Sequence, residues 1–300
     1  MKDIIRNYKQ HKLMYWIALV IMTYFIIFSY IPMGGLIMAF QKYKMGDGIL
    51  GSKFVGFENF IRFFEGPYFA RLMINTLRIS LLDLLFSFPA PIILACMLNE
   101  LRGKVFKRTV QTITYMPYFL SMVVLCGLVK NFTSSDGIVT QIVNSLGGNY
   151  GSMLADTRAF VPIFIVSNII QTVGFNSIIY LAALSSVDQE LYEAAKVDGA
   201  GYFKQWIHIT LPGISSTIVI MLILKMGQLM NVNFEKIILL YSQSTYDVAD
   251  VISSYIYRVG LVGGDYSYST AIGLFNSVIA FILVIISNAV SKKYAETSLF

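Results

Sequence analysis

The chain has 300 residues, of which 56% are hydrophobic and only 13% are charged, and its formal net charge at pH 7 is +6. Soluble domains carry about a quarter charged residues, so this composition excludes an ordinary soluble domain and indicates a membrane protein. The cations are not gathered on one aromatic-interleaved face, which argues against a nucleic-acid partner.

The N-terminal segment imitates a secretion signal. Its cations are followed by an apolar run from Leu13 to Phe40, and they are Lys2, Arg6, Lys9 and Lys12. The run is too long for the apolar core of a signal peptide and lacks an A-x-A-like cleavage site. We therefore expect a retained first span.

Six apolar stretches are each long enough to cross about 30 Å of hydrocarbon. Lipid offers no partner for an unpaired backbone amide, so each span should be helical. The expected fold class is an all-α integral membrane protein, with residues 1–300 forming one six-span domain. The predicted spans are 13–39, 73–98, 110–130, 160–183, 214–232 and 269–290.

The distribution of Lys and Arg predicts the orientation of the spans. The short loop 99–109 contains Arg102, Lys104, Lys107 and Arg108. Short loops rich in Lys and Arg face the cytoplasm. We therefore expect both termini and the segment 184–213 to be cytoplasmic.

Two segments on the opposite side have helical periodicity. Apolar residues between Val248 and Val259 follow the i, i+3, i+4, i+7 spacing of an amphipathic helix. We expect this helix to lie along the outer membrane surface or to pack on the bundle. Phe57 to Phe64 predicts a shorter element of the same kind.

The segment 184–213 is polar although it separates two long apolar runs. Ser186 and Gln189 fit a capping box, which predicts a helix from about Val187. Gly199 and Gly201 would allow the positive-φ backbone that ends the helix and turns the chain.

A second short helix is expected in this segment over Tyr202–Ile209. Pro212 is expected where span five begins, since the first turn of a helix needs no N–H donor there. The Ala194 and Ala195 pair gives the first helix a small-residue face that suits a groove in a partner protein. The alternative is an ordinary solvated loop.

These residues carry a family resemblance. Glu193-Ala194-Ala195, Asp198-Gly199-Ala200, Ile209 and Leu211-Pro212 resemble the EAA loop of permease subunits of binding-protein-dependent ABC importers. Phe86–Arg102, Thr114–Val129 and Tyr257–Val284 resemble oligosaccharide and polysaccharide permeases. These permeases are similar to the maltose-transporter type, in a branch common in Gram-positive bacteria.

The resemblance implies the type I ABC importer permease fold, in a bacterial cell membrane. It implies that this EAA loop couples to an ATPase dimer, which binds ATP and Mg²⁺, while this chain needs no cofactor. It also implies a second homologous permease, surrounding membrane lipid and an extracellular, lipid-anchored solute-binding protein. The implied coupling residues are Glu193, Ala194, Ala195, Asp198, Gly199, Ala200 and Gly201. In this chain Ser215 and Ser216 follow where related sequences often carry another proline, which concerns only the entry into span five.

Two charges lie deep in the predicted spans. Burying a charge in a membrane is costly, so Asp83 and Lys225 are functional candidates by default. Two alternatives stay open: the two residues pair across the bundle, or Lys225 faces the translocation path. Asp83 would also be the ion-linked carboxylate of a gradient-driven secondary transporter, which is the alternative from another class.

Sugar recognition needs amides and hydroxyls for hydrogen bonding and aromatic faces for the sugar ring. Several polar and aromatic side chains lie at a suitable depth, although hydrogen bonds between helices are an alternative explanation for them. The candidate substrate-path residues are Gln171, Phe175, Asn176, Lys225, Gln228 and Asn231.

No motif for chemistry is present in the sequence. It contains no G-x-x-x-x-G-K-[ST] phosphate loop and no HExxH or Cys/His cluster, so we predict no catalytic residue and no metal site. Cys96 and Cys126 lie in apolar runs and are expected to be small core residues. With these absences, the resemblance implies a non-catalytic permease for oligosaccharides, with a permease for another solute as the alternative within the family.

Overall fold

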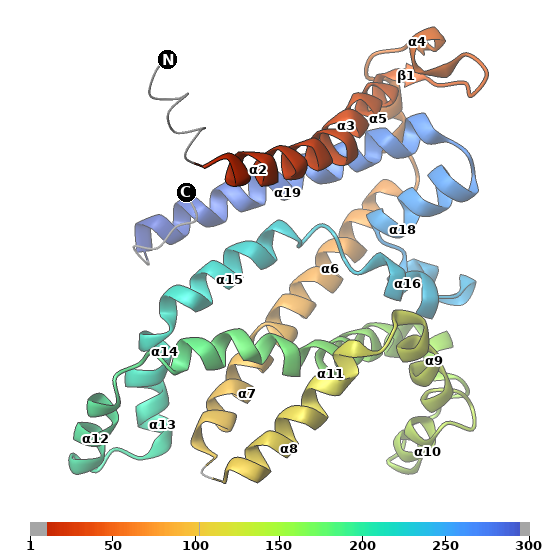
Figure 1. Cartoon of the computed structure of the whole chain (residues 1–300). Coiled ribbons are helices and arrows are strands. Elements are labelled where there is room, and N and C mark those ends of the chain that lie inside the picture. The colour runs from red at the N-terminus through yellow and green to blue at the C-terminus, as the bar shows by residue number, and fades with distance from the viewer. Residues whose placement is uncertain (1–10, 102, 295–300) are drawn as a thin grey trace. The chain divides into compact units, whose positions relative to one another are not determined.

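The computed structural model describes residues 11–101 and 103–294, and most of these are helical (Figure 1). Among them, four helical runs are long and apolar enough to cross a membrane. Two bent helix pairs raise that number to six if each pair forms one span. The uninterrupted runs are Lys12–Phe40, Phe69–Glu100, Thr157–Leu184 and Tyr266–Lys293.

The predicted third span, 110–130, is not one continuous helix. It comprises α8 (Lys104–Tyr115), η3 (Met116–Phe119) and α9 (Met122–Phe132), with a bend of 101°. The bend follows Pro117, where Leu120 takes an extended conformation. Ser121 then restarts the helix, because its Oγ accepts a hydrogen bond from the Val124 N–H.

The predicted fifth span also differs from a single helix. Its helical part is α15 (Ser215–Gly227). A helical run precedes α15 and meets it at a bend of 67°; the run consists of α13 (Tyr202–Gln205), η5 (Trp206–Thr210) and α14 (Leu211–Gly213). Pro212 therefore lies in the helical run ahead of the bend, rather than at the first turn of the span helix. After Gly227 the chain turns and stays non-helical to Asn233, although the expected span extended to residue 232.

The chain forms two compact units, which are described separately. The first unit comprises residues up to Gly66 together with Ile256–Leu274. It contains a two-stranded antiparallel hairpin that the all-α prediction did not include, with Gln41 opposite Phe54. Its elements are α2 (Lys12–Phe25), η1 (Ile26–Tyr30), α3 (Ile31–Met33), η2 (Gly34–Phe40), β1 (Gln41–Lys42), α4 (Gly48–Gly51), β2 (Lys53–Phe54), α5 (Glu58–Phe64), η7 (Tyr257–Val262) and the first part of α19 (Tyr266–Tyr294).

Polar contacts hold the hairpin of the first unit in place. The buried Asn59 amide on α5 donates to the carbonyl oxygens of Ala39 and Gln41 at 2.9 and 3.0 Å. The Tyr43 N–H donates to Ser267 Oγ at 2.8 Å. Both contacts connect segments that are distant in sequence, so they fix the fold of this unit.

The second unit, Pro67–Tyr255 with Phe275 onward, contains both candidate sites. Its long helix α11 (Thr157–Leu184) packs against α6, α7 and α8. The remaining elements are α6 (Phe69–Ser87), α7 (Pro89–Glu100), α10 (Ile138–Ser145), η4 (Met153–Ala155), α12 (Gln189–Val197), α16 (Phe234–Leu240), η6 (Gln243–Thr245), α17 (Tyr246–Ala249) and the start of α18 (Ile252–Ile256). The short helices α10 and α16 were not predicted.

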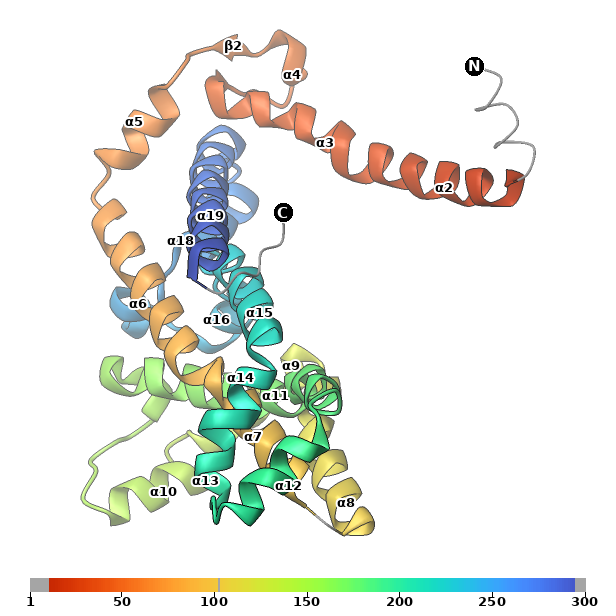
Figure 2. The same ribbon diagram turned by 90° about the vertical axis from the view of Figure 1, so that its left-hand side faces the viewer.

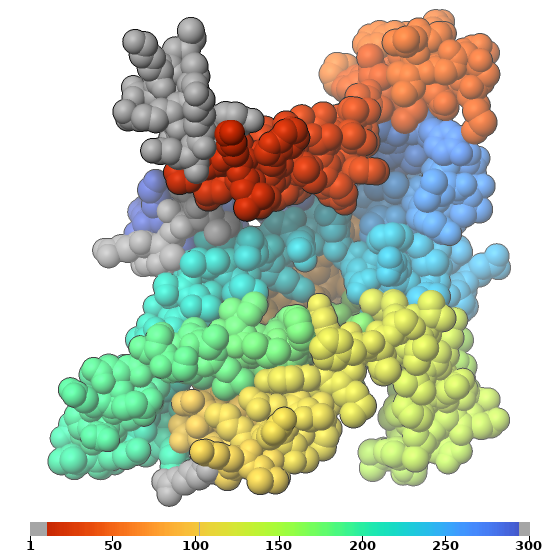
Figure 3. All heavy atoms as spheres, in the orientation of Figure 1, coloured from red at the N-terminus to blue at the C-terminus, as the bar shows by residue number. Residues whose placement is uncertain are grey.

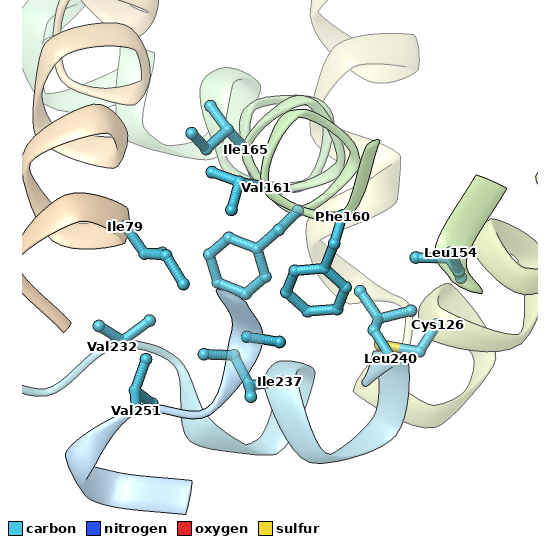
Figure 4. Packing of buried hydrophobic residues seen from close by; sticks show 12 residues of the cluster. Ile79, Cys126, Leu154, Phe160, Val161, Ile165, Val232, Ile237, Leu240 and Val251 are labelled. Carbon is cyan, nitrogen blue, oxygen red and sulfur yellow. The ribbon is translucent and has the colours of Figure 1, made fainter. Parts of the chain in front are cut away.

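An apolar core joins the helices of the second unit (Figure 4). Val161 on α11 lies among Ile79 of α6, Ile237 of α16 and Val232 of the non-helical segment. Side chains packed in this way gain dispersion contacts, which are the main attraction between helices in a membrane. The core therefore anchors the non-helical segment, whose own backbone hydrogen bonds are those of turns.

The predicted amphipathic helix at 248–259 is broken. α17 ends at Ala249 and α18 begins at Ile252, because Asp250 and Val251 leave the helical conformation. Ala249 and Val251 are fully buried in the apolar core, so this part of the segment packs on the bundle, which is one of the two alternatives expected. Helical periodicity alone does not separate the two cases, since both need one apolar face.

Candidate functional site

The first candidate site is the helix α12 and the turn that follows it. The predicted capping box is wrong: α12 begins at Gln189, and Asp188 Oδ1 accepts a hydrogen bond from the Glu190 N–H at 2.9 Å. Ser186 Oγ instead donates to the Ala183 carbonyl at 2.7 Å, closing the end of α11. The cap thus lies two residues later, because Ser186 still belongs to the preceding turn.

The C-terminal end of α12 is a Schellman turn. Gly199 has φ of +73°, and its N–H donates to the Lys196 carbonyl at 3.1 Å. The Ala200 N–H donates to the Ala195 carbonyl at 2.8 Å, which completes the motif. The expected positive φ is found at Gly199 but not at Gly201, whose φ of −69° is open to any residue.

Buried side chains attach α12 to the helical run before α15. The Tyr192 hydroxyl lies 3.1 Å from Thr210 Oγ1, and Gln205 Nε2 donates to the Ala200 carbonyl at 2.7 Å. Tyr192 also packs in a cluster with Leu184 and Ile214. The sequence did not lead us to single out Tyr192, Thr210 or Gln205. The available signal was Tyr192, an aromatic residue that lies off the alanine face of α12.

The opposite face of α12 is exposed. Glu193, Ala194 and Gly199 face solvent, and Ala195 is half-buried. Val197 and Phe203, which flank the turn, are 88% and 72% exposed. Figure 2 shows α12 and α13 side by side, and Figure 3 shows α12 at the surface of its unit. This end of α12 therefore exposes small and charged residues beside two large apolar side chains.

The second candidate site is a cavity of about 550 Å³ in the second unit. It lies between α6, α7, α11, α15 and the non-helical segment 228–233. Its polar lining residues are Ser80, Asp83, Ser87, Asn168, Thr172, Asn176, Lys225, Gln228, Asn231 and Asn233. The aromatic residues Phe88, Phe164 and Tyr180 also line it.

Four of the six substrate-path candidates line this cavity: Asn176, Lys225, Gln228 and Asn231. The other two make contacts elsewhere. Gln171 Oε1 accepts a hydrogen bond from the buried Lys236 Nζ at 3.3 Å. The Phe175 ring stacks on Tyr118, with ring centroids 3.9 Å apart.

Asp83 and Lys225 form an ion pair in the cavity wall. Lys225 Nζ lies 2.7 Å from Asp83 Oδ2. Asp83 Oδ1 accepts two further hydrogen bonds, from Asn168 Nδ2 at 2.6 Å and Ser87 Oγ at 2.7 Å. The first sequence alternative, an Asp83–Lys225 pair, is therefore found, and Lys225 also lines the cavity. That Lys225 faces a translocation path stays a prediction. Ser87 and Asn168 were missed, although the i, i+4 spacing of Asp83 and Ser87 placed them on one helix face.

Side chains from neighbouring helices support the non-helical segment. Ser80 Oγ donates to the Leu229 carbonyl, and Ser253 Oγ donates to the Val232 carbonyl at 3.4 Å. Asn276 Nδ2 donates to Asn231 Oδ1 at 2.9 Å. Irregular backbone at membrane depth requires such partners, so this segment is held as a fixed part of the cavity wall.

Among residues 11–101 and 103–294, no group of three or more His, Cys, Asp or Glu side chains is arranged to hold a metal ion. Cys96 and Cys126 are buried and not joined in a disulfide. The two candidate sites therefore offer surfaces and hydrogen-bonding groups, with no assembled metal centre in this part of the chain.

Comparison with known proteins shows one family and several full-length relatives. The model of the binding-protein-dependent transport system inner membrane component matches residues 87–296. Protein LplB of Bacillus subtilis (strain 168) is 43% identical, over 97% of this chain and 92% of that protein. The polygalacturonan/rhamnogalacturonan transport system permease protein YteP, from the same organism, is 42% identical over 97% of this chain and 91% of that protein.

A solved structure has the same fold. A chain of a bacterial alginate ABC transporter, in complex with an alginate pentasaccharide-bound periplasmic protein, matches with a TM-score of 0.90 and 42% identity. The match covers 98% of this chain and 99% of that chain.

Proposed function

The chain belongs to the binding-protein-dependent transport system inner membrane components, and we propose that it imports oligosaccharide fragments of polysaccharides as one permease of a pair. Membership makes it a non-catalytic, multi-pass membrane permease of an ABC importer, which works with a solute-binding protein and other transporter subunits. Family membership therefore replaces the alternative of a gradient-driven secondary transporter, in which Asp83 would be the ion-linked carboxylate.

The sugar class is supported by the relatives and by the cavity. YteP is named for polygalacturonan and rhamnogalacturonan, and the similar structure belongs to an alginate importer. The cavity combines amides, hydroxyls and aromatic rings, which are the groups that bind sugars. The Asn176 and Gln228 side chains make no hydrogen bond within the described residues, so both amides are available to sugar hydroxyls.

The exposed face of α12 is the proposed docking site for the ATPase, and this observation carries the mechanism. Glu193, Ala194 and Ala195 would enter a cleft of that subunit, while the Schellman turn at Gly199 fixes the end of the helix. The Tyr192–Thr210 contact then transmits displacement of α12 to the helical run that leads to α15. ATP and Mg²⁺ would be bound by the partner and not by this chain.

The orientation follows from this proposal. Docking of a cytoplasmic ATPase places α12 and both termini inside the cell, which agrees with the cations of loop 99–109. A lipid-anchored solute-binding protein would dock on the outer side, in a Gram-positive cell membrane. The second permease of the pair would complete the wall of the path.

Cross-linking in the assembled complex tests the docking site. Ala194→Cys should form a cross-link with the ATPase, whereas Leu146→Cys, which is also exposed but lies after α10, should not. The absence of a cross-link from Ala194→Cys in an ATP-hydrolysing complex would contradict the docking proposal.

Uptake measurements test the solute class. Proteoliposomes that contain the complex and its binding protein should accumulate trigalacturonate only when ATP is supplied inside. Accumulation of sn-glycerol-3-phosphate instead would favour the non-sugar alternative, because a permease named for that solute is 28% identical over 82% of this chain.

A further inference from the structure

The cavity wall holds one cation and one anion. Among the described residues that line it, Asp83 and Lys225 are the only charged side chains. They lie on α6 and α15 and are joined at 2.7 Å. A carboxylate that enters the cavity can therefore find an opposite charge only at Lys225.

Lys225 retains donors for such a ligand. An ammonium group has three N–H donors, and the Lys225 ammonium gives one of them to Asp83 Oδ2. The side chain of Lys225 is 35% exposed, whereas that of Asp83 is 12% exposed. The cation is thus the more accessible member of the pair.

Asp83 does not depend on Lys225 alone. Its other oxygen, Oδ1, accepts hydrogen bonds from Ser87 on the same helix and Asn168 on α11. Hydrogen bonds to a charged carboxylate stabilise that charge. Asp83 can therefore stay ionised while it shares the Lys225 ammonium with a second carboxylate.

We propose that Lys225 selects acidic oligosaccharides during translocation by binding a sugar carboxylate, with Asp83 as a fixed counter-ion that competes for the same ammonium. This inference rests on the proposed sugar-import function. The competition has a purpose in transport, because a site along a path must bind strongly enough to admit the solute but weakly enough to release it. Asn176 and Gln228 would contact hydroxyls of the same sugar.

The test compares two forms of one substrate. The assembled importer, with its binding protein, is placed in proteoliposomes, and uptake of trigalacturonate is divided by uptake of its fully methyl-esterified form. The binding protein contributes equally to this ratio in every variant, so a change in the ratio reports on the permease. Lys225→Met should lower the ratio at least tenfold, and Lys225→Arg, which keeps the charge, should hold it within about threefold.

Two further variants separate selectivity from structural support. Asp83→Asn should keep or raise the ratio, because the ammonium loses its competitor. The double variant, Asp83→Asn with Lys225→Met, leaves no unpaired charge in the cavity wall. If the pair is purely structural, this variant should restore the uptake ratio. If Lys225 selects carboxylates, the uptake ratio should stay low. A restored ratio in the double variant, or an unchanged ratio in Lys225→Met, would overturn the inference.

The inference and the proposed function can fail separately. If the wild-type importer takes up neither trigalacturonate nor its ester, the proposed function fails. If it takes up both and the ratio does not respond to position 225, only the inference fails.

Discussion

The Tyr192 hydroxyl lies 3.1 Å from the Thr210 hydroxyl, and this contact joins α12 to the helical run that precedes α15. Both residues are buried, and Thr210 Oγ1 also lies 3.3 Å from the Gln205 carbonyl. Buried, packed groups transmit displacement because interiors are close-packed. The pair therefore joins α12 to the helical run before α15, and under the proposed function it would carry displacement of α12 towards the cavity.

Tyr192→Phe should weaken this connection while keeping the aromatic packing. Loss of one hydrogen bond should cost about 1 kcal/mol of stability, and transport per ATP hydrolysed should fall. Tyr202→Phe is the matched control, because Tyr202 is 56% exposed on α13. The measurements are Tm and the ratio of sugar imported to ATP consumed; equal ratios in the two variants would contradict the prediction.

Gly199→Ala should disturb the end of α12. A side chain at φ of +73° is strained by about 1–2 kcal/mol, so the Schellman turn should shift and uptake should decrease. Gly201→Ala is the control: its φ is −69°, and an added Cβ would meet no atom within 4 Å. Uptake in both variants checks the prediction, which is refuted if the two substitutions have the same effect.

Gly174→Ala should destabilise the second unit. An added Cβ on α11 would collide with the backbone carbonyl of Thr114 on α8, so these helices would have to separate. Overpacking typically costs about 1–3 kcal/mol, which should appear as a lower Tm and reduced yield. In Gly127→Ala, also helical, the new methyl group meets no atom within 4 Å, so Tm should be unchanged or higher. Equal Tm values for the two variants would contradict the predicted collision.

Lys236 should make stability depend on pH. Burial of its ammonium lowers the pKa of Lys236 to about 8, although Cys126 and Asp83 partly oppose the shift. The unfolded chain binds this proton more tightly, so the cost of burying the charge is present in full below pH 8 and disappears as pH rises towards 10.5. The slope contributed by this one group is at most about 1.4 kcal/mol per pH unit.

The Lys236→Met variant isolates that contribution. At pH 7 the unfolding free energy of the variant, relative to that of the wild type, should be at its highest. By pH 10 this relative value should have fallen, because the wild type is stabilised as Lys236 loses its proton. Measuring the difference cancels the titration of other groups common to both proteins. A difference that is constant across this range would mean that the Lys236 pKa is not lowered.

Hydropathy and turn chemistry predicted much of this molecule. The runs around 13–39, 73–98, 160–183 and 269–290 appear as uninterrupted helical segments, since each has the length and apolar character that a bilayer requires. The EAA spacing identified the family that the comparisons show. The turn at Gly199 followed from the freedom of glycine to adopt positive φ.

The remaining features depend on tertiary contacts. The expected span extended to residue 232, but α15 ends at Gly227, and the three amides Gln228, Asn231 and Asn233 that follow were not read as a local signal for that end. Its end is stabilised by Ser80 and Ser253, which lie far away in sequence and hydrogen-bond to the Leu229 and Val232 carbonyls. The Asp83–Lys225 ion pair was likewise only one of two open alternatives. Periodicity assigns a side chain to a helix face, but it does not identify the partner on another helix.

The non-helical stretch from Gln228 to Asn233 has one further consequence. Its Leu229 and Val232 carbonyls accept hydrogen bonds from Ser80 and Ser253, and the Asn231 amide oxygen accepts one from Asn276, so these groups are already engaged. Under the proposed import function, the Gln228 amide would take the place of water around a sugar in this cavity. The interruption of α15 would in that case lower the cost of removing water from the passing solute.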